Sequence, residues 1–160
     1  MNDLASHEDR SLLCRAATIL CALPLPRVVE TMRPLPIRPL GGMPSFVCGL
    51  SVIRGVAIPV VNAAALLGLP THEQATRLVT LRTGERLVAL AVEEVVGVRT
   101  LSSVSLQTLP PLLHRVKPKV ITLIGMLDAN LLVVLQDSRI VPDWIWRSLA
   151  GNGDTLCPLA

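Results

Sequence analysis

The chain has 160 residues and a formal net charge of +3, with 51% hydrophobic and 17% charged residues. This length is sufficient for one substantial hydrophobic core, so one domain is the default expectation. The arginines are scattered singly, and the chain contains one Phe, two Trp and no Tyr. Both observations argue against nucleic-acid binding, because no dense basic tract could neutralise phosphates and few aromatic side chains could stack on bases.

Neither a membrane-spanning segment nor a secretion signal is indicated. Residues 55–71 carry no charge, but two prolines, an asparagine and a glycine interrupt them. The run is also shorter than the roughly 20 apolar residues of a spanning helix, and we expect it to be buried core. The first ten residues, MNDLASHEDR, lack the apolar stretch of a secretory signal. These features predict a cytoplasmic protein without direct membrane insertion.

The elements predicted first along the chain are strands, turns and one short helix. The prolines of residues 23–44 exclude a long helix and favour edge strands and turns, which predicts a loop-rich N-terminal half. The stretch NAAALLG predicts a short helix that Asn62 caps and Gly68 ends. Residues 77–98 predict two strands that meet at a turn near Thr83 and Gly84.

The C-terminal third predicts a second hairpin and a further helix. Residues 120–135 have apolar flanks around a turn at Asp128, Ala129 and Asn130. A helical segment is expected to open at Asp137, and the tail GNGDTLCPLA, which has no periodicity, is expected to fray.

The sequence contains an internal echo. The stretch LCALPLPRVVE lines up with LVALAVEEVVG, and IPVVNAAALL resembles LVVLQDSRIV, which suggests two halves with one plan. Aliphatic strands also match one another by chance, so the echo leaves both explanations open. A real repeat would make each half a small barrel, because closure removes exposed strand edges. The matched pairs are Leu20/Leu87, Ala22/Ala89, Leu23/Leu90, Val28/Val95 and Val29/Val96.

No constellation of residues indicates catalysis, a cofactor or a metal. Gly41 and Gly42 precede a proline instead of opening a helix, and are expected to form a turn. Glu93 and Glu94 would point to opposite faces of a strand, and Ser51 lacks a GxSxG context. The histidines and cysteines lack metal-binding spacing, so we expect buried thiols and structural or solvent-facing histidines. These residues alone leave catalysis open but give it no support. These residues are His7, His72, His114, Cys14, Cys21, Cys48 and Cys157.

Arg54 interrupts the apolar run GLSVIRGVAIPVVN and precedes Gly55. A turn with glycine at positive φ would carry this side chain away from the core. One interpretation is a solvated turn charge that keeps a hairpin soluble. The other is an anchor for a partner, because arginine binds carboxylates bidentately and is enriched at binding hot spots.

The stretch FVCGLSVIRGVAIPVVN resembles the CheW family of chemotaxis coupling proteins. The residues that fit the family's pattern here are Phe46, Gly49, Ile53, Arg54, Gly55, Ile58, Pro59 and Val60. Upstream, Val28 and Glu30 fall in place, and downstream TRLVTLRTGERLVALAVEEVVGV and LIGMLDANLLVVLQDSRIV are similar to later parts of the pattern. The resemblance extends from about Leu12 to Val141.

This resemblance implies a mainly β fold of two packed, five-stranded, SH3-like β-barrel subdomains with short accessory helices. It implies a flexible N-terminus at residues 1–10, a CheW-like domain with two intertwined subdomains at 11–142, and a helix end and tail at 143–160. It also implies a non-catalytic adaptor between the regulatory domain of a CheA-type histidine kinase and the cytoplasmic tip of methyl-accepting chemotaxis receptors. The expected partner-binding residues are Val28, Glu30, Gly49, Ile53, Arg54 and Gly55.

Three positions depart from the family's pattern. Asn62 replaces a usual acidic residue, Val52 stands where Asn is common, and Cys21 stands where an aromatic residue is frequent. The acidic side chain that Asn62 replaces is a candidate partner of Arg54, which the change would remove. The departures leave open whether the pathway is flagellar chemotaxis or another chemosensory system. The competing hypothesis is a small-ligand-sensing barrel or an unrecognised enzyme, with a pocket between the two halves.

Overall fold

The structure, a computed structural model, describes residues 10–71, 74–101, 106–108 and 120–151, and it is dominated by β-strands. In chain order the elements are β1 (Arg10–Ala16), β2 (Ile19–Pro24), the 3-10 turn η1 (Leu25–Arg27), β3 (Val28–Met32), β4 (Val47–Ile53), β5 (Val56–Asn62), α2 (Ala63–Leu66), β6 (Arg77–Thr83), β7 (Arg86–Val92), β8 (Glu94–Thr100), β9 (Leu106–Thr108), β10 (Ile121–Leu127), β11 (Asn130–Leu135), the 3-10 turn η4 (Asp137–Arg139) and α3 (Asp143–Gly151).

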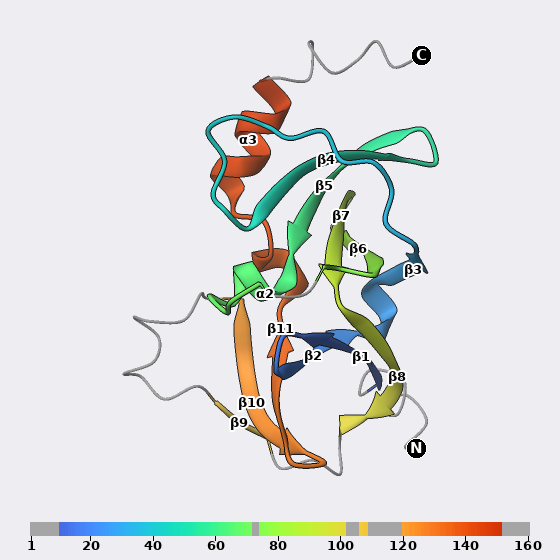
Figure 1. The fold of residues 1–160 in the computed structure, drawn as a ribbon, viewed down its shortest axis with the longest axis vertical. Coiled ribbons are helices and arrows are strands. Elements are labelled where there is room, and N and C mark those ends of the chain that lie inside the picture. Colours follow the sequence, from blue (N-terminus) through green and yellow to red (C-terminus); the bar gives the residue numbers. More distant parts are fainter. Residues whose placement is uncertain (1–9, 72–73, 102–105, 109–119, 152–160) are drawn as a thin grey trace.

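The strands form two sheets, which occupy the two halves of the molecule in Figure 1. The first sheet has six strands in the order β8-β1-β2-β11-β10-β9, and the second has five in the order β3-β6-β7-β5-β4. The expected mainly β architecture of two small units is confirmed, with one strand more than expected in the first sheet.

Both sheets are built on the same plan. The hairpin β1–β2 lies in the first sheet, and the chain then crosses so that β3 pairs with β6 at the edge of the second. The hairpin β6–β7 lies in the second sheet, and the chain crosses back so that β8 pairs with β1. The hairpins β4–β5 and β10–β11 attach through the parallel pairs β5–β7 and β11–β2. The echo therefore reflects a structural repeat, to which β9 is an addition.

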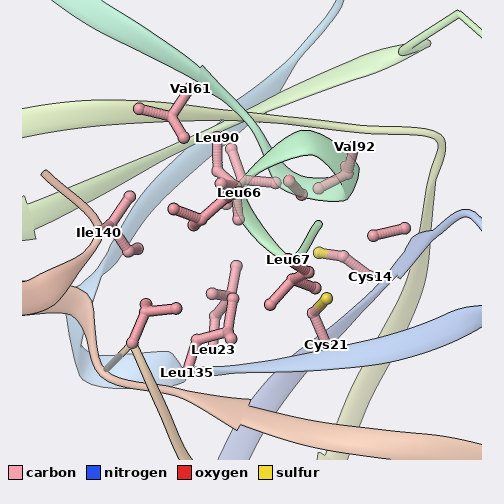
Figure 2. Close-up of a cluster of buried hydrophobic side chains, with 14 of the residues drawn as sticks. Cys14, Cys21, Leu23, Val61, Leu66, Leu67, Leu90, Val92, Leu135 and Ile140 are labelled. Atoms are coloured by element: carbon pink, nitrogen blue, oxygen red, sulfur yellow. The ribbon is translucent and has the colours of Figure 1, made fainter. Parts of the chain in front are cut away.

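The core follows the alternation of side chains along the central strands. In β7, Val88 and Leu90 lie in a large cluster that draws on both sheets, whereas Ala89 lies in a smaller cluster of the second sheet. In β2, Leu23 belongs to the large cluster and Ala22 to a smaller cluster of the first sheet. Successive residues point to opposite faces of a strand, so strands buried on both faces appear as continuous apolar runs. Figure 2 shows the large cluster.

Several local predictions are confirmed. Asn62 caps α2, because its side-chain Oδ1 accepts a hydrogen bond of 2.9 Å from the backbone N–H of Ala65. Gly68 follows this helix with a φ of +72°. The turns at 84–85 and 128–129 join β6 to β7 and β10 to β11, and residues 41–42 form a turn. The proline-rich segment contains no long helix.

Two boundaries differ from prediction. The apolar run after Gly84 is two strands, because β7 ends at Val92 and Glu93 carries the chain into the first sheet, where its N–H donates to the carbonyl of Arg15. A helical segment does open at Asp137, as predicted, but it is the 3-10 turn η4 that ends at Arg139. The α-helix begins separately at Asp143, because Pro142 disfavours a helical conformation in the residue before it. The described part of the N-terminal half also holds all of β1 to β5, which is more strand than a loop-rich segment would contain.

Residues 1–9 and 152–160, the three histidines and Cys157 lie outside the described residues, as do the predictions made for them. None of the described helices has the length and apolar character required to cross a bilayer. The expected domain boundaries at residues 11 and 142 stay a prediction.

Candidate partner-binding surface

The six residues expected to bind partners lie on β3 and on the β4–β5 hairpin. β3 and β4 are the two edge strands of the second sheet in its hydrogen-bonding order, and a two-residue turn joins β4 to β5. The side chain of Arg54, in that turn, nevertheless reaches Glu30 on β3. The structure therefore brings Arg54 together with Glu30, which lies 24 residues away in the sequence.

The turn at Arg54 and Gly55 has the geometry of a tight hairpin. Both residues have positive φ, 51° for Arg54 and 79° for Gly55. Positive φ at both central residues matches the twist of the flanking strands, and glycine adopts it without steric cost. The expected turn is confirmed, and it leaves the Arg54 side chain 79% exposed.

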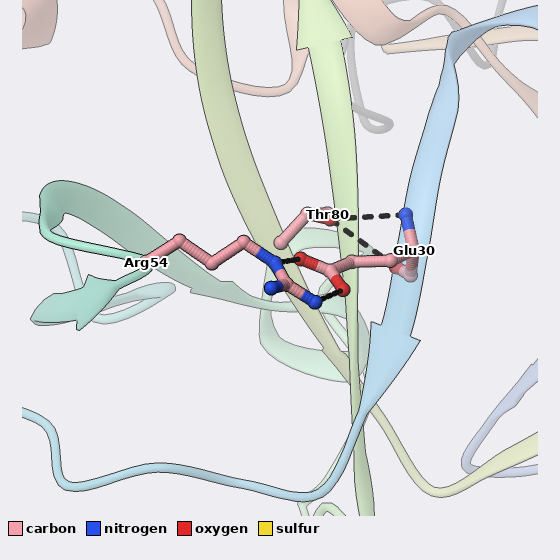
Figure 3. A network of polar contacts seen from close by, with 3 residues as sticks. All are labelled: Glu30, Arg54 and Thr80. Atoms are coloured by element: carbon pink, nitrogen blue, oxygen red, sulfur yellow. Dashed lines mark hydrogen bonds and ion pairs between the residues drawn. The ribbon is translucent and has the colours of Figure 1, made fainter.

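Glu30 holds Arg54 through a bidentate ion pair, shown in Figure 3. Arg54 Nε donates to Glu30 Oε1 and Arg54 Nη2 donates to Glu30 Oε2, both at 2.7 Å. The backbone of Glu30 is fixed in turn by the buried side chain of Thr80 on β6. The Glu30 N–H donates to Thr80 Oγ1, and that hydroxyl donates to the Glu30 carbonyl, each at 3.2 Å. Arg54 is thus positioned by a chain of contacts that leads back to the sheet interior.

The ion pair shifts the pKa values of both partners. Hydrogen bonds from Arg54 hold the pKa of the Glu30 carboxyl below its ordinary value, and the positive charge of Arg54 acts in the same direction. The same hydrogen bonds and the charge of Glu30 raise the pKa of the Arg54 guanidinium. Both groups therefore stay ionised at neutral pH, and the surface presents a fixed dipole.

The remaining expected residues have packing roles in this structure. Ile53 is buried in the smaller core of the second sheet, and Val28 is partly buried against the large cluster. Gly49 is buried with a φ of +143°, and a Cβ there would lie 2.1 Å from the carbonyl oxygen of Arg38. Their direct contact with a partner stays a prediction.

Exposed apolar residues occur close to Arg54 and Glu30 along the same strands, and a groove lies on the β4–β5 hairpin. Val52 and Val56, which flank the turn, are 44% and 51% exposed, and Val29 beside Glu30 is 46% exposed. Val52 and Ala57 also line a groove of about 600 Å³ with Leu50 and the loop of residues 36–39. An exposed charge beside apolar side chains is typical of protein-binding surfaces.

Sequence reasoning missed two parts of this surface. Thr80 gave no signal, because threonine is common on strands for reasons of propensity alone. The prediction that an acidic partner of Arg54 would belong at position 62 is wrong: Asn62 is the helix cap, and the acidic partner is Glu30. The resemblance identified both Glu30 and Arg54, but nothing in the sequence indicated that they pair.

The structure offers little else that could support chemistry. No group of three or more His, Cys, Asp or Glu side chains suited to a metal occurs among the described residues. Cys14 and Cys21 are buried in the large cluster (Figure 2), where desolvation raises the pKa of the Cys14 thiol to about 12 and that of Cys21 still further. Thiols of this kind behave as small hydrophobic side chains, as expected. Cys48, which was also expected to be buried, is only partly buried.

A second cavity, of about 690 Å³, is lined by residues from both halves of the chain. Its wall combines apolar residues with four polar ones. The lining residues are Phe46, Leu66, Val120, Gln136, Ser138, Arg139, Ile140, Pro142 and Asp143.

Comparisons with known proteins agree on the fold. The CheW-like domain family matches residues 10–143 of the chain. Among solved structures, the chain is similar to the scaffolding protein TtCheW from Thermoanaerobacter tengcongensis, with a TM-score of 0.71 and 18% sequence identity over 83% of this chain and 92% of that one. Curated protein sequences give no match. Because the family match spans most of the sequence, the chain belongs to the CheW-like domain family.

Proposed function

We propose that this protein is a non-catalytic adaptor that couples methyl-accepting chemotaxis receptors to a CheA-type histidine kinase. Membership of the CheW-like family supports this role. The observation that carries it is the exposed Arg54, held by Glu30 at 2.7 Å beside exposed valines. This surface has the composition of a protein-binding site, and the described part of the chain leaves it open.

The geometry suggests how this surface would bind. The bidentate pair uses two of the guanidinium's five N–H groups, which leaves the others free to donate to a carbonyl or carboxylate of a partner. Because Glu30 already restricts the arginine side chain, less conformational entropy is lost on binding. The valines beside the pair would supply the apolar area that such a contact buries. The expected contact residues are Val28, Glu30, Gly49, Ile53, Arg54 and Gly55.

The test is a titration of the purified protein against two partners, the regulatory domain of a CheA-type kinase and the cytoplasmic tip of a receptor. We expect micromolar binding of the wild type. Arg54→Glu should weaken binding to at least one partner by about tenfold or more, because it places a second carboxylate beside Glu30. Isothermal titration calorimetry would measure both affinities.

Two controls make the result interpretable. Arg77→Glu changes the same charge at an exposed position at the start of β6, outside the surface, and should leave both affinities unchanged. The melting temperature of Arg54→Glu should fall by less than about 4 °C, because an exposed turn residue contributes little to stability. Unchanged affinity for both partners in Arg54→Glu would contradict this assignment of the surface.

The cavity of about 690 Å³ favours a second candidate function, the sensing of a small ligand. Its volume suits a metabolite, and its wall mixes apolar side chains with Arg139 and Asp143, which could orient a polar group. A thermal-shift screen would separate the two functions, because a bound metabolite raises the melting temperature in a saturable manner and an adaptor responds to protein partners alone.

A further inference from the structure

The cavity of about 690 Å³ lies where equivalent segments of the two halves meet. Of its lining residues, Phe46 directly precedes β4 and Val120 directly precedes β10, so the two hold the same place in the repeat. The carbonyl of Phe46 accepts a hydrogen bond of 2.8 Å from the N–H of Asn62, and the carbonyl of Val120 accepts one of the same length from the N–H of Gln136. The frame of the cavity is therefore built in the same way by both halves.

The two halves differ in the short helical turns that border the cavity. Leu66 and Ile140 are counterparts in these turns, and both line the cavity. The three residues before Leu66 are alanines, whereas the three before Ile140 are Asp, Ser and Arg. Because alanines are sufficient to build the equivalent turn, the fold does not require Ser138 and Arg139. These two residues give the cavity a polar wall that comes from one half alone.

The two charged groups of the cavity wall do not neutralise each other. Arg139 is the last residue of η4, and Asp143 is the first residue of α3. In one continuous helix, side chains four residues apart would pair, but Pro142 separates the two helical segments. Within the described parts of the chain, neither side chain forms an ion pair or a hydrogen bond. Both charges are thus available to a bound molecule.

The segment that carries these charges is fixed to the rest of the fold. Ile140 and Ile145 are both 0% exposed in the large cluster. Asp137, which does not line the cavity, is bound to η1 by an ion pair of 3.9 Å. In α3, the ring of Trp146 lies 5.0 Å from the guanidinium carbon of Arg86 on β7. A wall held in this way loses little conformational freedom when a ligand binds.

We propose that this cavity binds a small zwitterion with an apolar body, namely an aliphatic or aromatic amino acid or a short peptide of such residues. Arg139 binds the carboxylate, and Asp143 binds the ammonium group. The apolar body lies against the half-buried Phe46 and the side chains of Leu66 and Ile140. The volume is within the range of roughly 300–1,000 Å³ that ligand cavities have. This inference rests on the second candidate function, ligand sensing, and names its ligand class.

Charge complementarity selects a zwitterion over simpler ligands. A guanidinium binds a carboxylate through charge-assisted hydrogen bonds, and an ammonium group donates such bonds to a carboxylate. A ligand with a carboxylate alone would leave Asp143 unpaired and place two negative charges in one cavity, and a ligand with an ammonium group alone would do the same with positive charges at Arg139. Apolar residues surround both groups, and walls of low dielectric constant strengthen electrostatic interactions.

The experiment is an NMR titration of the isotope-labelled full chain with leucine, phenylalanine and leucyl-leucine, without kinase or receptor. Two analogues of leucine serve as ligand controls: isocaproate, which lacks the ammonium group, and isopentylamine, which lacks the carboxylate. We expect saturable shifts of the backbone amides of residues 136–143. Leucine should bind at least about tenfold more tightly than either analogue, because each analogue loses one charge-assisted contact. The ratio of the affinities for leucine and leucyl-leucine separates a free amino acid from a peptide as the ligand.

Two variants assign the charged groups. Arg139→Gln should lower the affinity for leucine by about tenfold or more, because the cation that binds the carboxylate is removed. Asp143→Asn should abolish the preference for leucine over isocaproate, because the group that recognises the ammonium is removed. A merely structural effect would weaken both ligands alike. Arg147→Gln, at an exposed position of α3 that does not line the cavity, is the matched control and should bind leucine like the wild type.

The absence of saturable shifts with all three zwitterions at millimolar concentration would overturn the proposal. Equal affinities of the wild type for leucine and isocaproate, or binding that neither variant changes, would overturn it as well. The comparison of ligands uses the wild type alone, so it does not depend on how the variants fold. If the zwitterions fail and another metabolite of the thermal-shift screen binds the cavity, ligand sensing stands and this ligand class is wrong. The adaptor function is tested separately, with kinase and receptor.

Discussion

The side chain of Arg54 is exposed, yet contacts with other residues of the protein fix its conformation. Glu30 accepts two hydrogen bonds from it, and Thr80, which is 2% exposed, bonds both the N–H and the carbonyl of Glu30. Exposed ion pairs contribute little to stability in general. This network therefore contributes mainly to orientation, because it fixes the position of the Arg54 guanidinium on a surface that also carries exposed apolar side chains.

The pKa of the Glu30 carboxyl tests this network directly. Arg54 lowers it below the ordinary value of 4.5, so the pair stabilises the folded chain above that pH, and the stabilisation is lost as pH falls through the lower folded-state value. In Arg54→Gln we expect the Glu30 pKa to rise toward 4.5. An NMR titration of the side-chain carboxyl would measure the change.

A Glu30 midpoint that does not move on removal of the guanidinium would mean that the ion pair is not maintained in solution.

At this scale, the sequence predicts single residues better than their partners. Arg54 and Gly55 could be placed in a turn because a charged residue and a glycine separate two apolar runs. The ion pair that Arg54 forms with Glu30 on β3 could not be predicted, because Glu30 is 24 residues from Arg54 and 50 residues from Thr80 along the chain. Such contacts depend on how the two edges of one sheet approach each other, and local patterns carry no information on this.

Among the elements, strand β4 has its outer edge covered by a loop, and one glycine of the strand makes this close packing possible. The loop of residues 36–39 approaches so closely that Arg38 and Leu50 exchange two backbone hydrogen bonds of 2.7 and 2.9 Å. Gly49 permits this approach, because a Cβ would lie 2.1 Å from the Arg38 carbonyl oxygen. The groove on the β4–β5 hairpin is lined by the same loop, so its shape depends on Gly49 as well.

Gly49→Ala should destabilise the fold by about 2–4 kcal/mol, through backbone strain at positive φ and displacement of the loop. Gly97→Ala is the matched control. Gly97 has a nearly equal φ of +146°, but no atom lies within 4 Å of the position that its Cβ would occupy. Gly97→Ala should lower the free energy of unfolding by the backbone strain alone, about 1–2 kcal/mol.

Urea denaturation would measure both values. Equal losses in the two variants would show that the contact with Arg38 contributes nothing. A larger loss in Gly97→Ala would contradict the packing described for this edge.

Elements were predictable where turn residues mark them and not where the chain changes sheet. The hairpins β6–β7 and β10–β11 follow from Gly84 and from Asp128 to Asn130 between apolar runs. The passage from β7 to β8 lies within one such run, and only the register of β8 against β1 reveals it. The exchange of β3 and β8 between the sheets is thus a tertiary feature that local patterns cannot show.

For the whole molecule, the exchanged strands and the shared core make two similar halves into one structure. The large cluster takes side chains from both sheets and from α2 and α3. The smaller clusters belong to one sheet each, with Leu78 in the second and Leu132 in the first. β3 follows the hairpin of the first sheet but pairs in the second sheet, and β8 follows the hairpin of the second sheet but pairs in the first. Detachment of either strand would therefore disturb both sheets. We therefore expect the halves to unfold together.

Leu78→Ala and Leu132→Ala test this expectation as a reciprocal pair. The two leucines are 1% and 0% exposed, so each variant should lose about 2–5 kcal/mol. In a single cooperative unit, either substitution lowers the protection of the slowest-exchanging amides in both sheets by the same free energy. Hydrogen exchange would be followed in β1 and β2 for the first sheet and in β6 and β7 for the second. If Leu132→Ala lowered protection in the first sheet alone, and Leu78→Ala in the second alone, the halves would be independent folding units despite their exchanged strands.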